Sequence, residues 1–282
     1  MSKREATEQA STGKLFVVAT PIGNLDDLST RARDCLNQVD LIAAEDTRHS
    51  AALLRHYAIA TRCVALHEHN EREVSPDLVR QMQEGKCIAL ISDAGTPLIS
   101  DPGFRLVRAA RKAGIVISPL PGACAAIAAL CVAGLPSDRF AFEGFLPAKS
   151  GARRAQLESL RGETRTLIFY ESSHRIVEAL DDFGLVFGPE RRAVLARELT
   201  KRFETVLDGS VAELVEHLGA DADQQRGEFV LLIAGMQTDA PDTYLVEGQR
   251  VYKILCRELP PSRAAKLAAE ITGASRKLLY EG

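Results

Sequence analysis

Polar residues follow an apolar, strand-like run near the middle of the first half of the chain. Residues 87–91 form that run, and residues 92–97 read Ser-Asp-Ala-Gly-Thr-Pro. Gly95 can adopt positive φ and has no Cβ to obstruct a ligand. Asp93 and Thr96 add a carboxylate and a hydroxyl beside free backbone N–H groups. The pattern predicts a ligand-binding loop at the carboxyl end of a buried parallel strand, with an ordinary loop between a strand and a helix as the alternative.

Several familiar site signatures are missing from the sequence. Neither Gly-x-Gly-x-x-Gly nor Gly-x-x-x-x-Gly-Lys-Ser/Thr occurs, so dinucleotide and P-loop sites have no support. The pair His67 and His69 lacks a third zinc ligand, and no metal is expected. Ser172 precedes His174, but the Gly-x-Ser-x-Gly turn of a serine hydrolase is absent.

The order of apolar runs predicts an α/β protein in several parts. In residues 14–134 strands alternate with helices, which predicts a mainly parallel sheet in an N-terminal domain. Residues 135–236 carry more strand and predict a second α/β domain with a mixed sheet. Residues 244–282 read as helix, glycine turn and helix, similar to a helix-turn-helix unit. Residues 1–13 read as a disordered polar tail.

The composition bounds the cellular setting. The net charge of −3 argues against a uniformly basic surface but leaves room for a local basic face. The six cysteines include no Cys-x-x-Cys pair and fit a reducing compartment. No apolar run has the length of a membrane span, and the first fourteen residues lack the core of a signal peptide. The sequence predicts a cytoplasmic protein without a membrane partner.

Four short segments together resemble a known family. They are Ala-Glu-Asp-Thr-Arg at 44–48, Ser-Asp-Ala-Gly-Thr-Pro at 92–97, Tyr-Glu-Ser at 170–172 and Arg-Glu-Leu-Thr-Lys at 197–201. This set resembles the tetrapyrrole methylase-like class of S-adenosylmethionine-dependent methyltransferases, over residues from about 14 to 282. The first loop of that class is commonly Gly-x-Gly-Pro-Gly, whereas residues 19–23 here read Ala-Thr-Pro-Ile-Gly. The departure favours the RNA-methylating branch of the class.

The resemblance implies a fold and an activity. The fold has two α/β domains with the cofactor cleft between them, plus a small C-terminal helical unit. The cofactor is S-adenosylmethionine, and the reaction is methylation of a cytidine ribose 2′-hydroxyl in the decoding region of 16S rRNA, within the small ribosomal subunit. The family resemblance also implies a homodimer.

The same resemblance assigns expected roles to residues. Expected at the cofactor are Thr20, Pro21, Gly23, Ser92, Asp93, Ala94, Gly95, Thr96, Pro121, Gly122, Ala123, Tyr170, Ser172 and Leu199. Chemistry alone, apart from the resemblance, suggests the catalytic candidates. A ribose hydroxyl is a poor nucleophile, so a base or a cation that favours the alkoxide is needed, and the candidates at strand ends are Glu45, Asp46, Lys201 and Glu204, with a surface ion pair or a helix cap as the alternative for each. Expected at RNA are Arg48, Arg153, Arg154, Arg202, Arg263, Lys266, Arg276 and Lys277.

Two other functions fit the same sequence. The first is a small-molecule methyltransferase acting on a tetrapyrrole, for which the basic C-terminal helices would have no purpose. The second is a non-catalytic RNA-binding assembly protein, which a titration with S-adenosylmethionine separates from an enzyme.

The C-terminal helices generate a prediction about RNA. If residues 244–282 hold RNA, their deletion weakens RNA binding and flattens its salt dependence, because fewer phosphate contacts release fewer counterions. Filter binding between 50 and 300 mM salt measures the slope, and cofactor affinity is the control that should stay unchanged. An unchanged slope would assign these helices to packing instead.

Overall fold

A computed structural model describes residues 13–236, 243–276 and 279. The chain forms two compact units, one of Met1–Arg161 with Thr166–Ile233 and one of Gly162–Arg165 with Ala234–Gly282. The predicted tail, apart from Gly13, and Lys277 lie outside the described residues.

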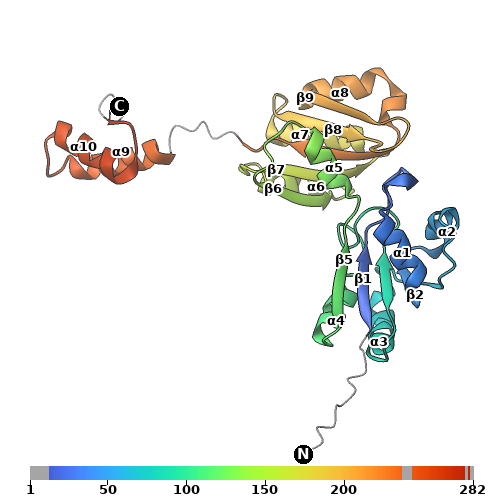
Figure 1. The fold of residues 1–282 in the computed structure, drawn as a ribbon. Coiled ribbons are helices and arrows are strands. Elements are labelled where there is room, and N and C mark those ends of the chain that lie inside the picture. Colours follow the sequence, from blue (N-terminus) through green and yellow to red (C-terminus); the bar gives the residue numbers. More distant parts are fainter. Residues whose placement is uncertain (1–12, 237–242, 277–278, 280–282) are drawn as a thin grey trace, which may run out of the picture. The chain divides into compact units, whose positions relative to one another are not determined.

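The first sheet is parallel throughout and confirms the predicted α/β organisation of the first half (Figure 1). Its strands lie in the order β3-β2-β4-β1-β5. They are β1 (Lys14–Val18), β2 (Leu41–Ala44), β3 (Cys63–Ala65), β4 (Ile88–Ile91) and β5 (Val116–Leu120). The strands β2 and β4 are fully buried, as expected for strands covered by helices on both faces.

Helices cover both faces of this sheet. One apolar cluster joins one face to α1 (Thr30–Gln38) and α2 (Thr47–His56). A second cluster joins the other face to α3 (Glu71–Gln83) and α4 (Phe104–Lys112). A short 3-10 helix, η1 (Leu25–Asp27), precedes α1. The polar loops predicted for the site follow the carboxyl ends of β1, β2 and β4.

The second sheet is mixed, as predicted. Its order is β6-β7-β10-β8-β9, with β6 and β7 parallel and the other pairs antiparallel. The strands are β6 (Phe140–Phe145), β7 (Thr166–Ser172), β8 (Arg192–Arg197), β9 (Thr205–Ser210) and β10 (Glu228–Ile233). One face packs on α6 (Ser150–Ser159), α7 (Ile176–Phe187) and α8 (Val211–Ala220), which η2 (Ala222–Gln225) follows. The helix α5 (Ala125–Val132) contacts β7 and β10, although it precedes the domain boundary predicted after residue 134.

The second unit contains two helices in the part of the chain where a C-terminal helical unit was predicted. It consists of α9 (Thr243–Leu255) and α10 (Pro261–Thr272), and α10 ends at Gly273, whose φ is +76°. Alanines of α10 form a small core with Val251, Leu255 and Leu279. Across the ranges that the structure describes, no helix combines the length and apolarity needed to cross a membrane.

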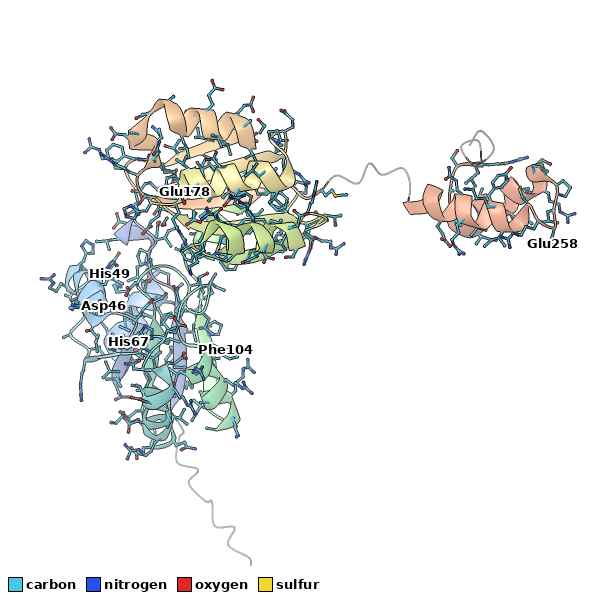
Figure 2. All side chains as sticks on the ribbon, turned by 180° about the vertical axis from the view of Figure 1, so that it is seen from behind. Asp46, His49, His67, Phe104, Glu178 and Glu258 are labelled. Atoms are coloured by element: carbon cyan, nitrogen blue, oxygen red, sulfur yellow. The ribbon has the colours of Figure 1, made fainter. Side chains whose placement is uncertain are left out.

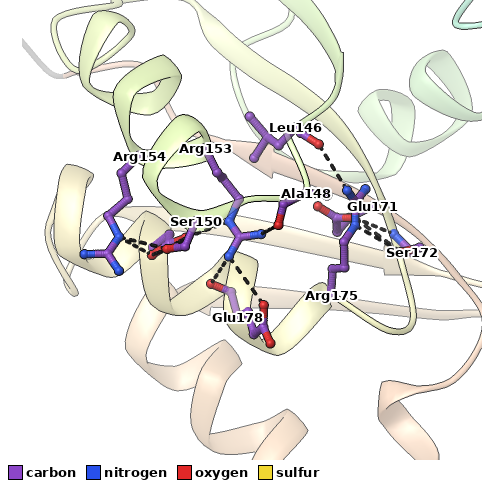
Figure 3. Close-up of polar contacts among 10 residues, drawn as sticks. Leu146, Ala148, Ser150, Arg153, Arg154, Glu171, Ser172, Arg175 and Glu178 are labelled. Atoms are coloured by element: carbon purple, nitrogen blue, oxygen red, sulfur yellow. Dashed lines mark hydrogen bonds and ion pairs between the residues drawn. The ribbon is translucent and has the colours of Figure 1, made fainter.

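A buried ion-pair network corrects one predicted RNA contact (Figure 3). The Arg153 side chain is 1% exposed, and its Nε lies 2.6 Å from Asp182 Oδ2. The Ser150 hydroxyl also donates to Asp182, and Arg154 Nε lies 2.7 Å from Asp182 Oδ1. The prediction that Arg153 binds RNA is wrong, because its guanidinium is buried and pairs with Asp182 in the helical layer that covers the second sheet.

This network predicts an asymmetric effect of two substitutions. Asp182→Asn should lower the free energy of unfolding by ~3–5 kcal/mol, because it leaves the buried Arg153 charge without its partner. Glu178→Gln is the matched control, since Glu178 lies 3.7 Å from the same guanidinium but is 72% exposed. Its effect should stay within about 1 kcal/mol. Urea unfolding measures both, and equal effects would contradict this account of the network.

Candidate active site

The loops after β1 and β4 are tied together by their backbones. The Thr20 N–H donates to the Gly95 carbonyl at 2.8 Å, and the Gly95 N–H donates to the Thr20 carbonyl at 3.1 Å. Gly95 has φ +79°, and a Cβ at this position would lie 3.2 Å from Ile22 Cγ2. The positive φ and this close approach explain why the loop requires glycine.

Two carboxylates meet because β2 and β4 are neighbours. Ala44 is in register with Ile91, so Glu45 and Asp93 come together just beyond the strand ends. The Asp93 N–H donates to Glu45 Oε2 at 3.3 Å, and the Asp46 N–H donates to Asp93 Oδ1 at 3.0 Å. Burial raises the pKa of Glu45, and the charge of Asp93 raises it further, while the Asp93 N–H opposes the shift. Glu45 is therefore a better proton acceptor near neutral pH than an ordinary surface carboxylate.

A cavity of about 460 Å³ opens beside these loops. Its walls come from both sheets, with Ile22, Phe145, Tyr170, Leu199 and Val230 as apolar or aromatic members. The Tyr170 hydroxyl accepts a hydrogen bond from the Ala126 N–H at 3.1 Å, which fixes the ring at the start of α5. The volume falls in the range of cavities that bind cofactor-sized ligands.

A second cavity of about 250 Å³ adjoins the first. The two share Ile22, Asp93, Ala94 and Glu228 in their walls. The second cavity adds His49 and Lys201. A donor and an acceptor held in adjoining cavities would meet at the shared wall.

Lys201 is positioned by contacts on three sides. Its Nζ lies 2.9 Å from both Glu198 Oε1 and Glu228 Oε2. Burial lowers the pKa of Lys201, but the hydrogen bonds to these two carboxylates outweigh it and raise the pKa, which keeps the ammonium charged. A Cβ on Gly23 would lie 2.4 Å from Lys201 Cγ, so only glycine allows this approach of the first loop.

Asp46 is occupied at the beginning of α2. Its side chain accepts from the Arg48 N–H at 2.8 Å and pairs with the Arg48 guanidinium at 2.9 Å. Hydrogen bonds from Arg48 hold the pKa of Asp46 well below its usual range. Figure 2 shows Asp46 and His49 at the same end of α2. Asp46 lines neither cavity, and its geometry is that of a helix cap.

The structure separates the other predicted residues by location. The first cavity is lined by the cofactor candidates Asp93, Ala94, Gly95, Thr96, Tyr170, Ser172 and Leu199 and by the catalytic candidate Glu45. The second is lined by Thr20, Pro21, Gly23, Ser92, Asp93, Ala94 and Lys201. Four candidates line neither cavity: Pro121, Gly122, Ala123 and Glu204. Two of them still contact residues of the site. The Ala123 carbonyl accepts a hydrogen bond from the Thr96 hydroxyl at 2.9 Å, and the Glu204 carboxylate accepts one from the Thr200 N–H at 2.6 Å.

The remaining RNA candidates lie on the surface. The side chain of Arg48 is 91% exposed and pairs with Asp46, and Arg154 is 53% exposed. Arg202, Arg263, Lys266 and Arg276 are exposed as well. Their role at RNA stays a prediction.

Several cavity residues were not predicted from the sequence. They include Ile99, Ser100, Asp101, Cys124, Phe145, Glu171 and Gly227–Val230. Backbone strain marks one of these segments, since Leu98 and Ser100 have positive φ without being glycine, and it also marks the residues on either side of the predicted Leu199, Glu198 and Thr200. Such residues gather at functional sites. The Asp-Pro-Gly sequence at 101–103 was the only signal in the sequence near Asp101, and it suggests a helix start.

Comparison with known proteins decides the family. Residues 14–215 match the family described as Tetrapyrrole (Corrin/Porphyrin) Methylases, and residues 245–281 match the RsmI C-terminal HTH domain. "Ribosomal RNA small subunit methyltransferase I" of Pseudomonas aeruginosa is 57% identical over 96% of each chain. The protein of the same name from Escherichia coli O157:H7 is 51% identical over 99% of this chain and 97% of that one. The chain belongs to the ribosomal RNA small subunit methyltransferase I family.

Solved structures of more distantly related proteins have the same fold as this chain. Diphthine synthase is 15% identical, with a TM-score of 0.62 over 79% of this chain and 90% of that chain. A cobalt precorrin-4 methyltransferase is 17% identical, with a TM-score of 0.56 over 82% of this chain and 98% of that chain. At these identities the likeness concerns the fold alone.

The backbone hydrogen bonds between Thr20 and Gly95 lead to a prediction. Gly95→Val should weaken S-adenosylmethionine binding by at least tenfold, because the side chain strains the positive φ and displaces Ile22. Gly114→Val is the matched control: Gly114 has φ +74°, but nothing lies within 4 Å of its Cβ position. Calorimetric titration of both variants separates the shared backbone strain from the effect on the cavity. Equal affinities would show that this loop is not at the cofactor.

Proposed function

We propose that this chain transfers a methyl group from S-adenosylmethionine to small-subunit ribosomal RNA, at the 2′-hydroxyl of a cytidine ribose. The observation that carries the proposal is the pair of adjoining cavities, one of cofactor size and one that presents Lys201. The names of relatives that align over almost the whole chain support ribosomal RNA as the substrate.

The first cavity suits S-adenosylmethionine in both charge and shape. Its carboxylates suit a cationic ligand, and the apolar walls around Phe145 and Tyr170 suit an adenine ring. When bound, the cofactor supplies a methyl group that is already activated by the sulfonium charge. The chain therefore mainly has to bind the ribose, orient its hydroxyl and exclude water.

Lys201 and Glu45 have the properties that the acceptor requires. The Lys201 ammonium is held by Glu198 and Glu228 and stays charged, so it stabilises negative charge that develops on a ribose oxygen. Glu45, whose pKa is raised by burial, is suited to take the hydroxyl proton. Asp46, by contrast, is paired with Arg48 and is a weak base.

The test maps ribose methylation. Small ribosomal subunits from cells lacking the gene are incubated with the protein and S-adenosylmethionine, and 2′-O-methylated nucleotides are located by their resistance to alkaline cleavage. The expected result is one new methylated cytidine near the decoding region. Binding of RNA without cofactor affinity would support an assembly protein, and methylation of a tetrapyrrole would support the small-molecule enzyme; either result overturns the proposal.

Kinetics of two variants test the acceptor site. Lys201→Met should lower kcat by roughly a hundredfold while cofactor and RNA affinities change little, because the ammonium acts mainly in the transition state. Glu204→Gln is the matched control from the same loop, since Glu204 lines neither cavity. Single-turnover transfer of a tritiated methyl group measures the rate. A Lys201→Met enzyme with normal kcat would remove Lys201 from the mechanism.

A further inference from the structure

Two phenylalanine side chains in the described part of the chain are each 62% exposed, Phe104 and Phe203. A single exposed apolar residue is normal on a protein surface and needs no function. Phe203 differs from Phe104, because the guanidinium carbon of Arg202 lies 5.4 Å from the centroid of its ring. The ring of Phe104 has no such cation among the described residues.

Arg202 itself has no polar partner within the described ranges. It is exposed, and it forms neither an ion pair nor a hydrogen bond with any residue there. The charged residues beside it are occupied, since Lys201 pairs with two carboxylates and the Glu204 carboxylate accepts from the Thr200 N–H at 2.6 Å. The guanidinium of Arg202 is therefore free to meet a phosphate.

The backbone that carries Phe203 is held by several donors. Arg197 Nη1 and the Thr205 hydroxyl both donate to the Phe203 carbonyl at 3.2 Å. The Arg197 guanidinium also donates to the Asp223 carbonyl at 2.9 Å and to the Arg226 carbonyl at 2.6 Å. These bonds connect the loop between β8 and β9 to the turn before β10. The ring is thus presented from a fixed backbone, which lowers the entropy lost when a ligand packs on it.

The same loop carries Lys201, which lines the second cavity. Lys201 and Phe203 are two residues apart, so their Cα atoms lie no more than about 7 Å from each other. The Lys201 N–H donates to the Glu198 carbonyl at 3.0 Å, and the Glu204 N–H donates to the Lys201 carbonyl at 3.2 Å, which keeps the loop compact. A group that packs on Phe203 therefore lies close to an acceptor held at Lys201.

We propose that Phe203 and Arg202 form a stacking platform for a base of the ribosomal RNA that adjoins the methylated nucleotide. This inference rests on the proposed function. Unstacked bases of RNA pack on aromatic rings and on guanidinium planes, and an arginine beside the ring adds attraction to the phosphates. Every base has a face that can stack, so the platform holds the strand beside the second cavity without selecting a particular base.

Methylation kinetics on small ribosomal subunits test the platform with the full chain. Phe203→Ala should raise KM for the subunits roughly tenfold, in line with the loss of one stacked base, while affinity for S-adenosylmethionine stays unchanged. Phe203→Trp should keep KM within about threefold of wild type, because the indole also offers a stacking face. Phe104→Ala is the matched control, since Phe104 is equally exposed but begins α4 (Figure 2). Its KM should equal that of wild type.

Fluorescence provides a second measurement. The chain contains no tryptophan, so Phe203→Trp introduces a single reporter. Its emission should fall when protein-free small-subunit ribosomal RNA is added, because a stacked base quenches the indole, and the emission of Phe104→Trp should stay constant. Emission of Phe203→Trp that follows protein concentration instead of RNA would show that a second copy of the chain covers Phe203, and it would overturn the inference.

Arg202→Ala separates the charge from the ring. It should weaken RNA binding and reduce the slope of log Kd against log salt by about one, whereas Phe203→Ala should weaken binding without changing the slope. A wild-type KM for Phe203→Ala, or emission of Phe203→Trp that RNA does not change, would overturn the inference and leave the proposed function intact. Failure of the wild-type chain to methylate small-subunit ribosomal RNA would instead overturn the proposed function.

Discussion

The pair of hydrogen bonds between Thr20 and Gly95 is the constraint on which the site depends. It joins the carboxyl ends of β1 and β4, two neighbours at the centre of the parallel sheet. Ile22, Asp93 and Ala94 lie next to this tie, and all three line both cavities. A change in the backbone at Gly95 would therefore alter the wall that a methyl donor and its acceptor share.

The mixed topology of the second sheet supplies the facing wall. Because β10 is antiparallel to both β7 and β8, Phe229 lies in register with Glu171 on one side and Arg197 on the other. Consequently, the end of β7, the start of β10 and the loop after β8 all lie at the same end of the strands. This end of the sheet contributes Tyr170, Glu171, Leu199 and Glu228 to the first cavity and Lys201 to the second. A wholly parallel sheet would not place a strand's beginning beside the ends of its neighbours.

Local sequence patterns were enough to predict the α/β organisation of the molecule and part of its site. Apolar runs of strand length, each followed by a helical segment, were enough to predict the parallel sheet and the loop around Gly95. The segments Tyr-Glu-Ser and Arg-Glu-Leu-Thr-Lys were informative only through the family resemblance. What failed depended on contacts distant in sequence. Arg153 is buried against Asp182 from the next helix, and the pKa of Asp101 is raised by burial and by the charge of Glu45, which follows β2 rather than β4. Neither partner can be read from the neighbouring residues.

A crystal structure of the full chain with sinefungin would test the central claim most directly. The claim is that the cavity between Gly95 and Tyr170 holds the methyl donor with its reacting centre toward the wall shared with the Lys201 cavity. The account predicts density for the ligand in the first cavity, with the amine that replaces its methylated sulfur facing the wall shared with the second cavity. Density in another place, or an amine turned away from the shared wall, would contradict it.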